Sequence, residues 1–143
     1  MEPLERLHSL IDNLFTYERK RKENLKKLRQ LFIQLKIGEK VADIEELLTF
    51  NALNVTGLSL QKESLLQPQP GKYLQIIGIK KVDNRSKNIN LRYFGKVENL
   101  ENGLLQQVGE FVLRWRLEKG FMHLESYKEL LDGIEREVES KIS

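Results

Sequence analysis

The sequence has no cysteine, few histidines and no long hydrophobic run. Because its 143 residues include no cysteine, disulfide bonds, iron–sulfur clusters, thiolate metal sites and cysteine nucleophiles are excluded. The two histidines, His8 and His123, lie far apart in the sequence, so we expect no histidine-rich metal site. No apolar run approaches the ~18 residues that a membrane-spanning helix needs. These absences predict a protein without a bound metal and without a membrane partner.

The sequence motifs of common enzymes are missing as well. None of the patterns GxSxG, HExxH, GxGxxG and GxxxxGK followed by Ser or Thr occurs. Gly95-Lys96 could end a phosphate-binding loop, but Asn90 stands where that loop needs its first glycine. Asp83 is the single acid within 72–96, so no carboxylate pair is available there to hold a divalent cation. We therefore expect neither an enzyme nor a cofactor.

The N-terminal stretch MEPLERLHSL shows no basic segment followed by an apolar one. We therefore expect no secretory signal. Together with the lack of cysteine, this predicts a reducing compartment, and we expect a cytoplasmic protein. A chain of 143 residues is long enough to bury one hydrophobic core without covalent or metal support.

Charged residues are abundant and unevenly distributed. The 24 Lys and Arg residues exceed the 21 Asp and Glu residues by three, which gives a net charge of +3. By segment, the net charge is +4 for 1–37, −3 for 38–71, +6 for 72–97 and −4 for 98–143. Such blocks indicate either an anionic partner or docking of basic on acidic surfaces within or between subunits. The sequence leaves both explanations open.

Residues 1–37 predict a long amphipathic helix. Pro3 suits a first helical turn, and neither Pro nor Gly follows until Gly38. Eight apolar residues occupy the a and d positions of one heptad frame: Leu4, Leu7, Ile11, Leu14, Leu25, Leu28, Phe32 and Leu35. A helix of this length would run roughly 50 Å, whereas a compact domain of this size is about 40 Å across. The helix therefore either breaks near residues 16–22 or extends beyond its domain.

An overhanging apolar helix needs a cover, and a second copy of the chain is the simplest one. We therefore predict that 1–37 is a coiled-coil or oligomerisation segment whose eight a and d residues form the interface. A homo-oligomer, with a dimer favoured, would result. The remaining residues, 38–143, would form a small α+β domain.

Residues 38–97 predict one short helix and a small sheet. A short amphipathic helix is expected at 40–50 and a short strand at 55–60. Two β-forming stretches, 72–82 and 89–97, flank the polar turn residues 83–88 and predict a hairpin. The sheet is therefore expected to be small and antiparallel.

The C-terminal part predicts two amphipathic helices. The first covers about 104–119, carries Trp115 on its core face and is expected to end at Gly120. The second covers 124–142 and has an acidic charged side. The expected fold class is thus α+β, with a long N-terminal heptad helix, a central small antiparallel sheet with a hairpin, and two C-terminal amphipathic helices.

Two basic surfaces are candidates for binding nucleic acid. The first is an arc on the N-terminal helix, largely off its apolar seam: Arg19, Lys20, Lys22, Lys26, Lys27 and Arg29. The second is the hairpin, which carries cations and an aromatic ring: Lys80, Lys81, Arg85, Lys87, Arg92, Phe94 and Lys96. Cations can track phosphates, and an exposed ring can stack on a base. Alternatively, the arc is a solvated helix face and Phe94 is covered by a helix or a subunit.

Two functions therefore remain open at this stage. The first is a non-enzymatic adaptor, structural or regulatory protein that binds other proteins and self-associates through its N-terminal helix. The alternative is a nucleic-acid-binding protein that uses the arc 19–29, the hairpin 72–96 or both. The two readings differ in whether the basic hairpin is an open anion site or is neutralised by the acidic C-terminal helix.

Overall fold

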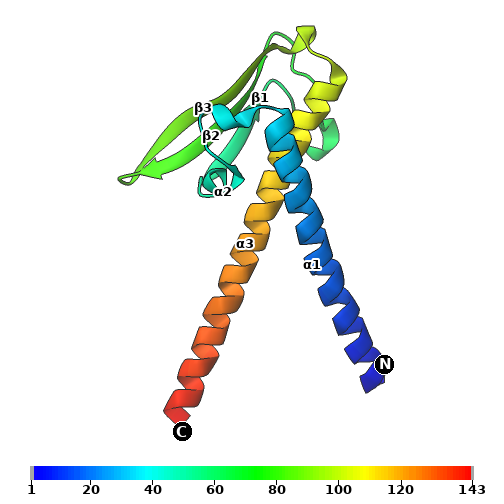
Figure 1. Ribbon diagram of the computed structural model, residues 1–143, viewed down its shortest axis with the longest axis vertical. Coiled ribbons are helices and arrows are strands. Elements are labelled where there is room, and N and C mark those ends of the chain that lie inside the picture. The colour runs from blue at the N-terminus through cyan, green and yellow to red at the C-terminus, as the bar shows by residue number, and fades with distance from the viewer. Residues whose placement is uncertain (1, 143) are drawn as a thin grey trace.

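The computed structural model describes residues 2–142, and the side chains of residues 10–15 and 142 lie outside the described part. Figure 1 shows a small head from which two long helices extend and diverge. Helix α1 (Pro3–Gln34) runs into the head, and α3 (Asn102–Ile142) runs out of it. The other elements are α2 (Ile44–Leu47), β1 (Ala52–Thr56), β2 (Tyr73–Val82) and β3 (Arg85–Lys96). We call residues 17–121 the head, and residues 3–16 and 122–142 the α1 leg and the α3 leg.

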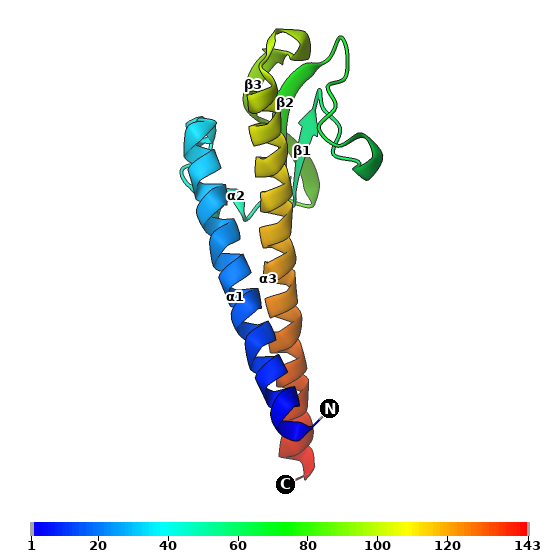
Figure 2. The same cartoon turned by 90° about the vertical axis from the view of Figure 1, so that its right-hand side faces the viewer.

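Both long helices extend beyond the head. α1 contains 32 residues and α3 contains 41, which corresponds to roughly 48 Å and 62 Å of helix. Pro3 lies in the first turn of α1, where its missing N–H leaves no bond unmade. α1 ends at Gln34 with Leu35 as its C-cap, and Lys36 then turns the chain in the left-handed conformation with φ 55°. Figure 2, turned by 90°, shows that both legs extend from the head in the same general direction.

The strands form one antiparallel sheet in the order β1-β2-β3. Asp83 and Asn84 form the turn of the β2–β3 hairpin, and their φ values of 52° and 64° match a two-residue turn. This turn is shorter than the predicted 83–88. β1 also begins three residues earlier than the predicted strand at 55–60.

The inner face of the sheet and the helices share one hydrophobic core. Leu74, Ile76 and Leu91 are buried on the sheet. The helices contribute Leu28, Leu31, Leu35, Val108, Phe111 and Val112. Trp115 is buried among them, and its indole nitrogen donates to the carbonyl oxygen of Leu47 at 3.1 Å. The prediction that Trp115 belongs to the core is therefore confirmed.

The fold class predicted from the sequence is wrong in its helices. The sequence predicts two C-terminal helices divided at Gly120, whereas α3 continues through Gly120 as one helix. A glycine inside a helix costs only about 1 kcal/mol relative to alanine, and Phe121 continues the packing beyond it. The helix predicted at 40–50 is likewise reduced to the four residues of α2. Within residues 2–142, no helix is long and apolar enough to cross a lipid bilayer.

Candidate functional site

α1 and α3 cross at a junction of aromatic and charged side chains. The rings of Tyr17 and Phe121 meet edge to face, with centroids 5.3 Å apart. The Arg21 guanidinium contacts Glu118 at 3.4 Å and Glu125 at 3.5 Å. Because Glu118 is buried and Arg21 is only partly exposed, this ion pair ties the helices together where the head ends.

A second polar contact secures the junction from inside the head. Asn24 is buried, and its amide donates to the carbonyl oxygen of Arg114 at 3.0 Å. The Arg114 guanidinium donates back to the Asn24 side-chain oxygen at 3.1 Å. The crossing point of the helices is thus fixed by reciprocal hydrogen bonds.

Beyond the junction the legs separate, and the described α3 side chains on the face toward α1 are charged. Residues at three- and four-residue spacing share one helix face, and the face that begins with Glu118 and Phe121 continues as Glu125, Lys128 and Asp132. Lys128 still reaches Tyr17, with its ammonium 5.1 Å from the ring centre. Below that level the described side chains on the inner face of the α3 leg are charged.

The apolar side chains of the α3 leg lie on another face and are exposed to solvent. They follow each other at spacings of seven, three, four, three and four residues: Leu117, Leu124, Tyr127, Leu131, Ile134 and Val138. Their exposed fractions range from 42 to 66%. We call this set the α3 seam. Its spacing is that of the a and d positions of a coiled coil.

A shallow apolar pocket extends the α3 seam upward along the head. It has a volume of about 340 Å³ and is lined by Leu65, Leu66, Leu113 and Leu117, with polar side chains around them. Leu66 packs where a side chain on Gly109 would lie. The apolar surface of α3 is therefore continuous from the head to the end of the leg.

The predicted oligomer interface on α1 divides into three groups. Leu28 and Leu35 are buried in the chain's own core, and Leu25 and Phe32 pack against it. These four are unavailable to a partner because the head already uses them. Leu4 and Leu7 are exposed on the α1 leg. The side chains of Ile11 and Leu14 lie outside the described residues.

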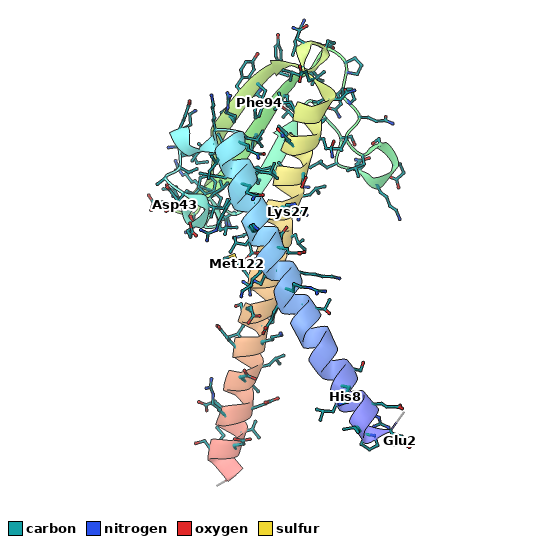
Figure 3. The ribbon with its side chains drawn as sticks, turned by 45° about the vertical axis from the view of Figure 1, so that its right-hand side comes forward. Glu2, His8, Lys27, Asp43, Phe94 and Met122 are labelled. Atoms are coloured by element: carbon teal, nitrogen blue, oxygen red, sulfur yellow. The ribbon has the colours of Figure 1, made fainter. Side chains whose placement is uncertain are left out.

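The predicted basic arc on α1 is mostly a solvated surface. Five of its cations are exposed: Arg19, Lys20, Lys22, Lys26 and Lys27. Arg29 instead forms an ion pair with Glu45 beside α2. Figure 3 shows Lys27 on α1 near the level of the junction, while His8 lies far down the α1 leg. No ring accompanies the exposed cations of the arc among the side chains that the structure describes.

The acidic α3 leg does not neutralise the basic hairpin. The leg points away from the sheet, and the hairpin projects from the head on one side (Figure 1). Lys81, Arg85 and Lys87 are exposed, and none of the ion pairs in the described part of the chain includes a hairpin cation. Lys80 lies directly opposite Lys87, an unfavourable cross-strand pair of like charges.

Arg92 and Phe94 are parts of the head rather than an open stacking platform. Arg92 Nε donates to the carbonyl oxygen of Leu35 at 3.0 Å, and its guanidinium lies 4.8 Å from the Phe94 ring centre. Phe94 packs against the core. Inward and outward side chains do not alternate strictly along this strand because the pairing shifts twice, which exposes Tyr93 and turns Phe94 inward.

Sequence reasoning missed a pair of tyrosines on the outer face of the sheet. Tyr73 and Tyr93 are 45 and 49% exposed, and their ring centres lie 5.9 Å apart. The pairing of Gln75 with Tyr93 places both rings on the face that points away from the core. The sequence places Tyr73 next to Lys72 at the start of a predicted strand. Only the β2–β3 register shows that Tyr93 lies beside Tyr73.

Two titratable groups have perturbed pKa values, and both have structural roles. A hydrogen bond from the Gly71 backbone N–H lowers the pKa of the Glu98 carboxyl, and Lys96 adds to this effect. Burial lowers the pKa of Lys119, whose ammonium donates to the carbonyl oxygen of Leu48 at 2.8 Å. Among the described residues, no group of three or more His, Asp or Glu side chains is placed to hold a metal ion.

Comparison with known proteins found no matching family model, no matching curated protein and no matching solved structure. The function therefore has to be inferred from the surfaces described above. Two of them are unpartnered: the α3 seam, and the outer face of the sheet with its basic hairpin.

Proposed function

We propose that this chain is a non-enzymatic interaction protein that self-associates through its legs. The observation that carries the proposal is the α3 seam, a heptad stripe of large apolar side chains that the chain itself leaves uncovered. Burying one such side chain contributes roughly 1.5–3 kcal/mol, so the seam residues that a partner covers together favour association strongly. A helix that stays in solvent gains nothing from this spacing, whereas packing against a second helix requires it.

The partner that fits the seam is the seam of a second copy, in antiparallel orientation. With Leu117 at position a, Lys128 and Glu135 both occupy e positions. An antiparallel pairing that sets Leu131 against Ile134 of the partner subunit brings Lys128 beside the partner's Glu135, and the two-fold axis repeats this pair. Charge complementarity thus supports a symmetric antiparallel dimer.

A parallel pairing lacks this complementarity. It would bring His123 toward Lys128 and Leu130 toward Glu135, without any pair of opposite charges at the e and g positions. It would also align the acidic ends of the two α3 legs with each other. The antiparallel dimer places the heads at opposite ends.

The solution mass tests self-association. At tens of micromolar we expect light scattering after size-exclusion chromatography to give twice the 16.8 kDa chain mass. The double variant L131E/I134E should be monomeric, because it places four carboxylates in the paired seam. The matched control is Ile33→Glu, which changes an exposed isoleucine of the head and should leave the dimer intact. A monomeric wild-type chain would contradict the proposal.

Spin labels test the orientation. Because the chain has no cysteine, a label on Met122→Cys is unique. The antiparallel register separates the two labels by roughly 30 Å along the helix axis, whereas a parallel dimer keeps them at the same level. A short label distance in a confirmed dimer would exclude the antiparallel arrangement and leave self-association intact.

A further inference from the structure

The outer face of the sheet is exposed, and different kinds of side chain lie along its length. Polar side chains occupy its middle: Asn54, Thr56, Gln75, Asn88 and Asn90. A hollow of about 370 Å³ lies over this region, and Ile77 and Ile79 form its apolar floor. The loop after β1 and Arg116 of α3 form its rim. This face therefore offers a shallow trough rather than a flat surface.

One end of the trough carries the tyrosine pair. Tyr73 and Tyr93 are tilted by 34° to each other and are each about half exposed. Thr56 Oγ1 donates to the backbone carbonyl oxygen of Tyr73 at 2.8 Å, which fixes the strand below the ring. Two held rings with free faces form a platform for flat ligands, because base–aromatic stacking works with any base.

The side-chain amides of the trough form few hydrogen bonds within the chain. Asn90 Nδ2 donates to the side-chain oxygen of Gln75 at 3.0 Å, and Asn54 contacts Arg116 at 3.4 Å. Asn88 lines the hollow without a side-chain hydrogen bond among those found for the described residues. Side-chain amides both donate and accept, as the edges of unpaired bases require.

Cations stand at both ends of the trough. Lys72 and Lys96 are exposed beside the tyrosines, and Lys96 pairs in register with Tyr73. Lys81 lies at the other end on the same face, next to the hairpin turn. Lys80, Lys87 and Arg92 lie on the opposite face of the sheet, toward the core, and do not contribute to this flank. Positive charge therefore flanks the trough along the direction of the strands.

We propose that the outer face of the sheet binds single-stranded nucleic acid, with bases on Tyr73 and Tyr93 and phosphates on the flanking lysines. The proposal goes beyond self-association and uses none of its residues. Unpaired strands fit better than duplexes because stacked bases inside a helix cannot reach the rings. An anionic membrane or an acidic protein would meet the lysines but would have no use for the two rings.

The first test measures binding of fluorescein-labelled single strands by anisotropy. Twelve-nucleotide oligo(U) and oligo(dT) should both bind at 50 mM salt. If about three phosphates are neutralised, affinity should fall about 20-fold between 50 and 200 mM salt. A duplex of equal length should bind at least tenfold more weakly. No binding of single strands at 50 mM, equal binding of the duplex, or binding of anionic vesicles alone would overturn the proposal.

Variants of the rings then locate the site. Tyr73→Ala and Tyr93→Ala should each weaken binding of oligo(U) about tenfold, because each removes one stacking surface. Tyr73→Phe and Tyr93→Phe keep that surface and should change binding less than twofold. Unchanged binding in the Y73A/Y93A double variant would exclude the outer face. Trp115 fluorescence verifies that each variant keeps its head folded.

Charge reversals separate the sheet from the basic arc on α1. K81E/K96E should weaken binding at least tenfold and flatten its salt dependence. The matched control K26E/K27E makes the same change in net charge on the exposed arc and should alter affinity less than threefold. The opposite result, with loss in K26E/K27E and none in K81E/K96E, would assign binding to α1 and overturn the proposal.

Discussion

The two halves of each long helix have similar amphipathic sequences and opposite surroundings. In the head, Leu28 of α1 and Phe111 of α3 are fully buried in a shared core. In the legs, Leu7 of α1 and Leu131 of α3 repeat the same apolar spacing but are exposed. A heptad pattern therefore predicts an apolar helix face without showing whether the chain's own core covers that face.

The head and the legs therefore differ in what stabilises them. The head has a sheet and α2 to complete its core, so it folds as a unit. The legs have no such support, because the described side chains that α3 presents toward α1 are charged. Isolated helices as short as the α1 leg are marginal in water, and under the proposed self-association a second copy would supply the missing stability. Each prediction below tests one part of this division.

The largest effect is expected from shortening a core leucine. Leu28→Ala should lower the free energy of unfolding by about 2–5 kcal/mol, because it leaves a cavity in the core. Leu131→Ala should leave the unfolding of the head nearly unchanged at protein concentrations low enough to keep the chain monomeric. Urea titration followed by Trp115 fluorescence measures both. Equal losses in the two variants would contradict the division into head and legs.

Changes at the junction should alter the free energy of unfolding less, by an amount that depends on whether one or both partners of the ion pair are replaced. Arg21→Ala leaves the Glu118 carboxylate buried without its cation, so we expect a loss of about 1–3 kcal/mol. Replacing both partners with apolar residues, as in R21M/E118L, should recover most of this loss, since no buried charge remains. The comparison uses the same urea titration. A double variant as unstable as R21A would show that the ion pair itself holds the helices together.

The boundary between head and leg on α3 is tested at Gly120. Gly120→Ala should raise the free energy of unfolding by about 0.5–1 kcal/mol, because alanine favours a continuous helix and has open space here. The matched control is Gly95→Ala, which should destabilise because Gly95 has φ 117°. Thermal melts of the two variants decide the sign. A destabilised G120A would indicate that the helix ends where the sequence predicts.

The smallest effect is expected at the Glu98 carboxyl, which is exposed. Its pKa is lowered in the folded state, so its contribution is present above the unfolded pKa and is lost as pH falls through the folded value. Glu98→Gln should therefore be less stable than the wild type near pH 7, and the difference should shrink as pH falls below the unfolded pKa of about 4.3. Melts across pH 3–7 measure this. A difference that is constant or grows as pH falls would contradict the assignment.

The core and the hairpin could be predicted from the sequence because their signals are local. Trp115 sits on an apolar helix face, and Asp83-Asn84 is a turn pair between β-formers. The continuity of α3 could not be predicted, because Gly120 is a normal helix end unless distant packing outweighs its propensity. Phe121 on Tyr17 is such a contact, and it joins residues far apart in the chain.

The candidate surfaces were only half predictable for the same reason. The apolar spacing of Leu124 to Val138 is visible in the sequence, but whether the head covers it depends on the angle between α1 and α3. Leu28 and Leu35 have the same heptad spacing but are buried in the chain's own core. The tyrosine platform depends on two shifts in the pairing of β2 with β3, and no local signal marks those shifts.

Hydrogen exchange followed by mass spectrometry, at two protein concentrations, tests the central claim most directly. If the legs are covered by a second copy, amides of 122–142 should be protected at tens of micromolar and should exchange quickly after dilution into the monomeric range. Amides of the head, such as those of 105–115, should exchange slowly at both concentrations. Fast exchange of 122–142 at every concentration, with a protected head, would contradict the account.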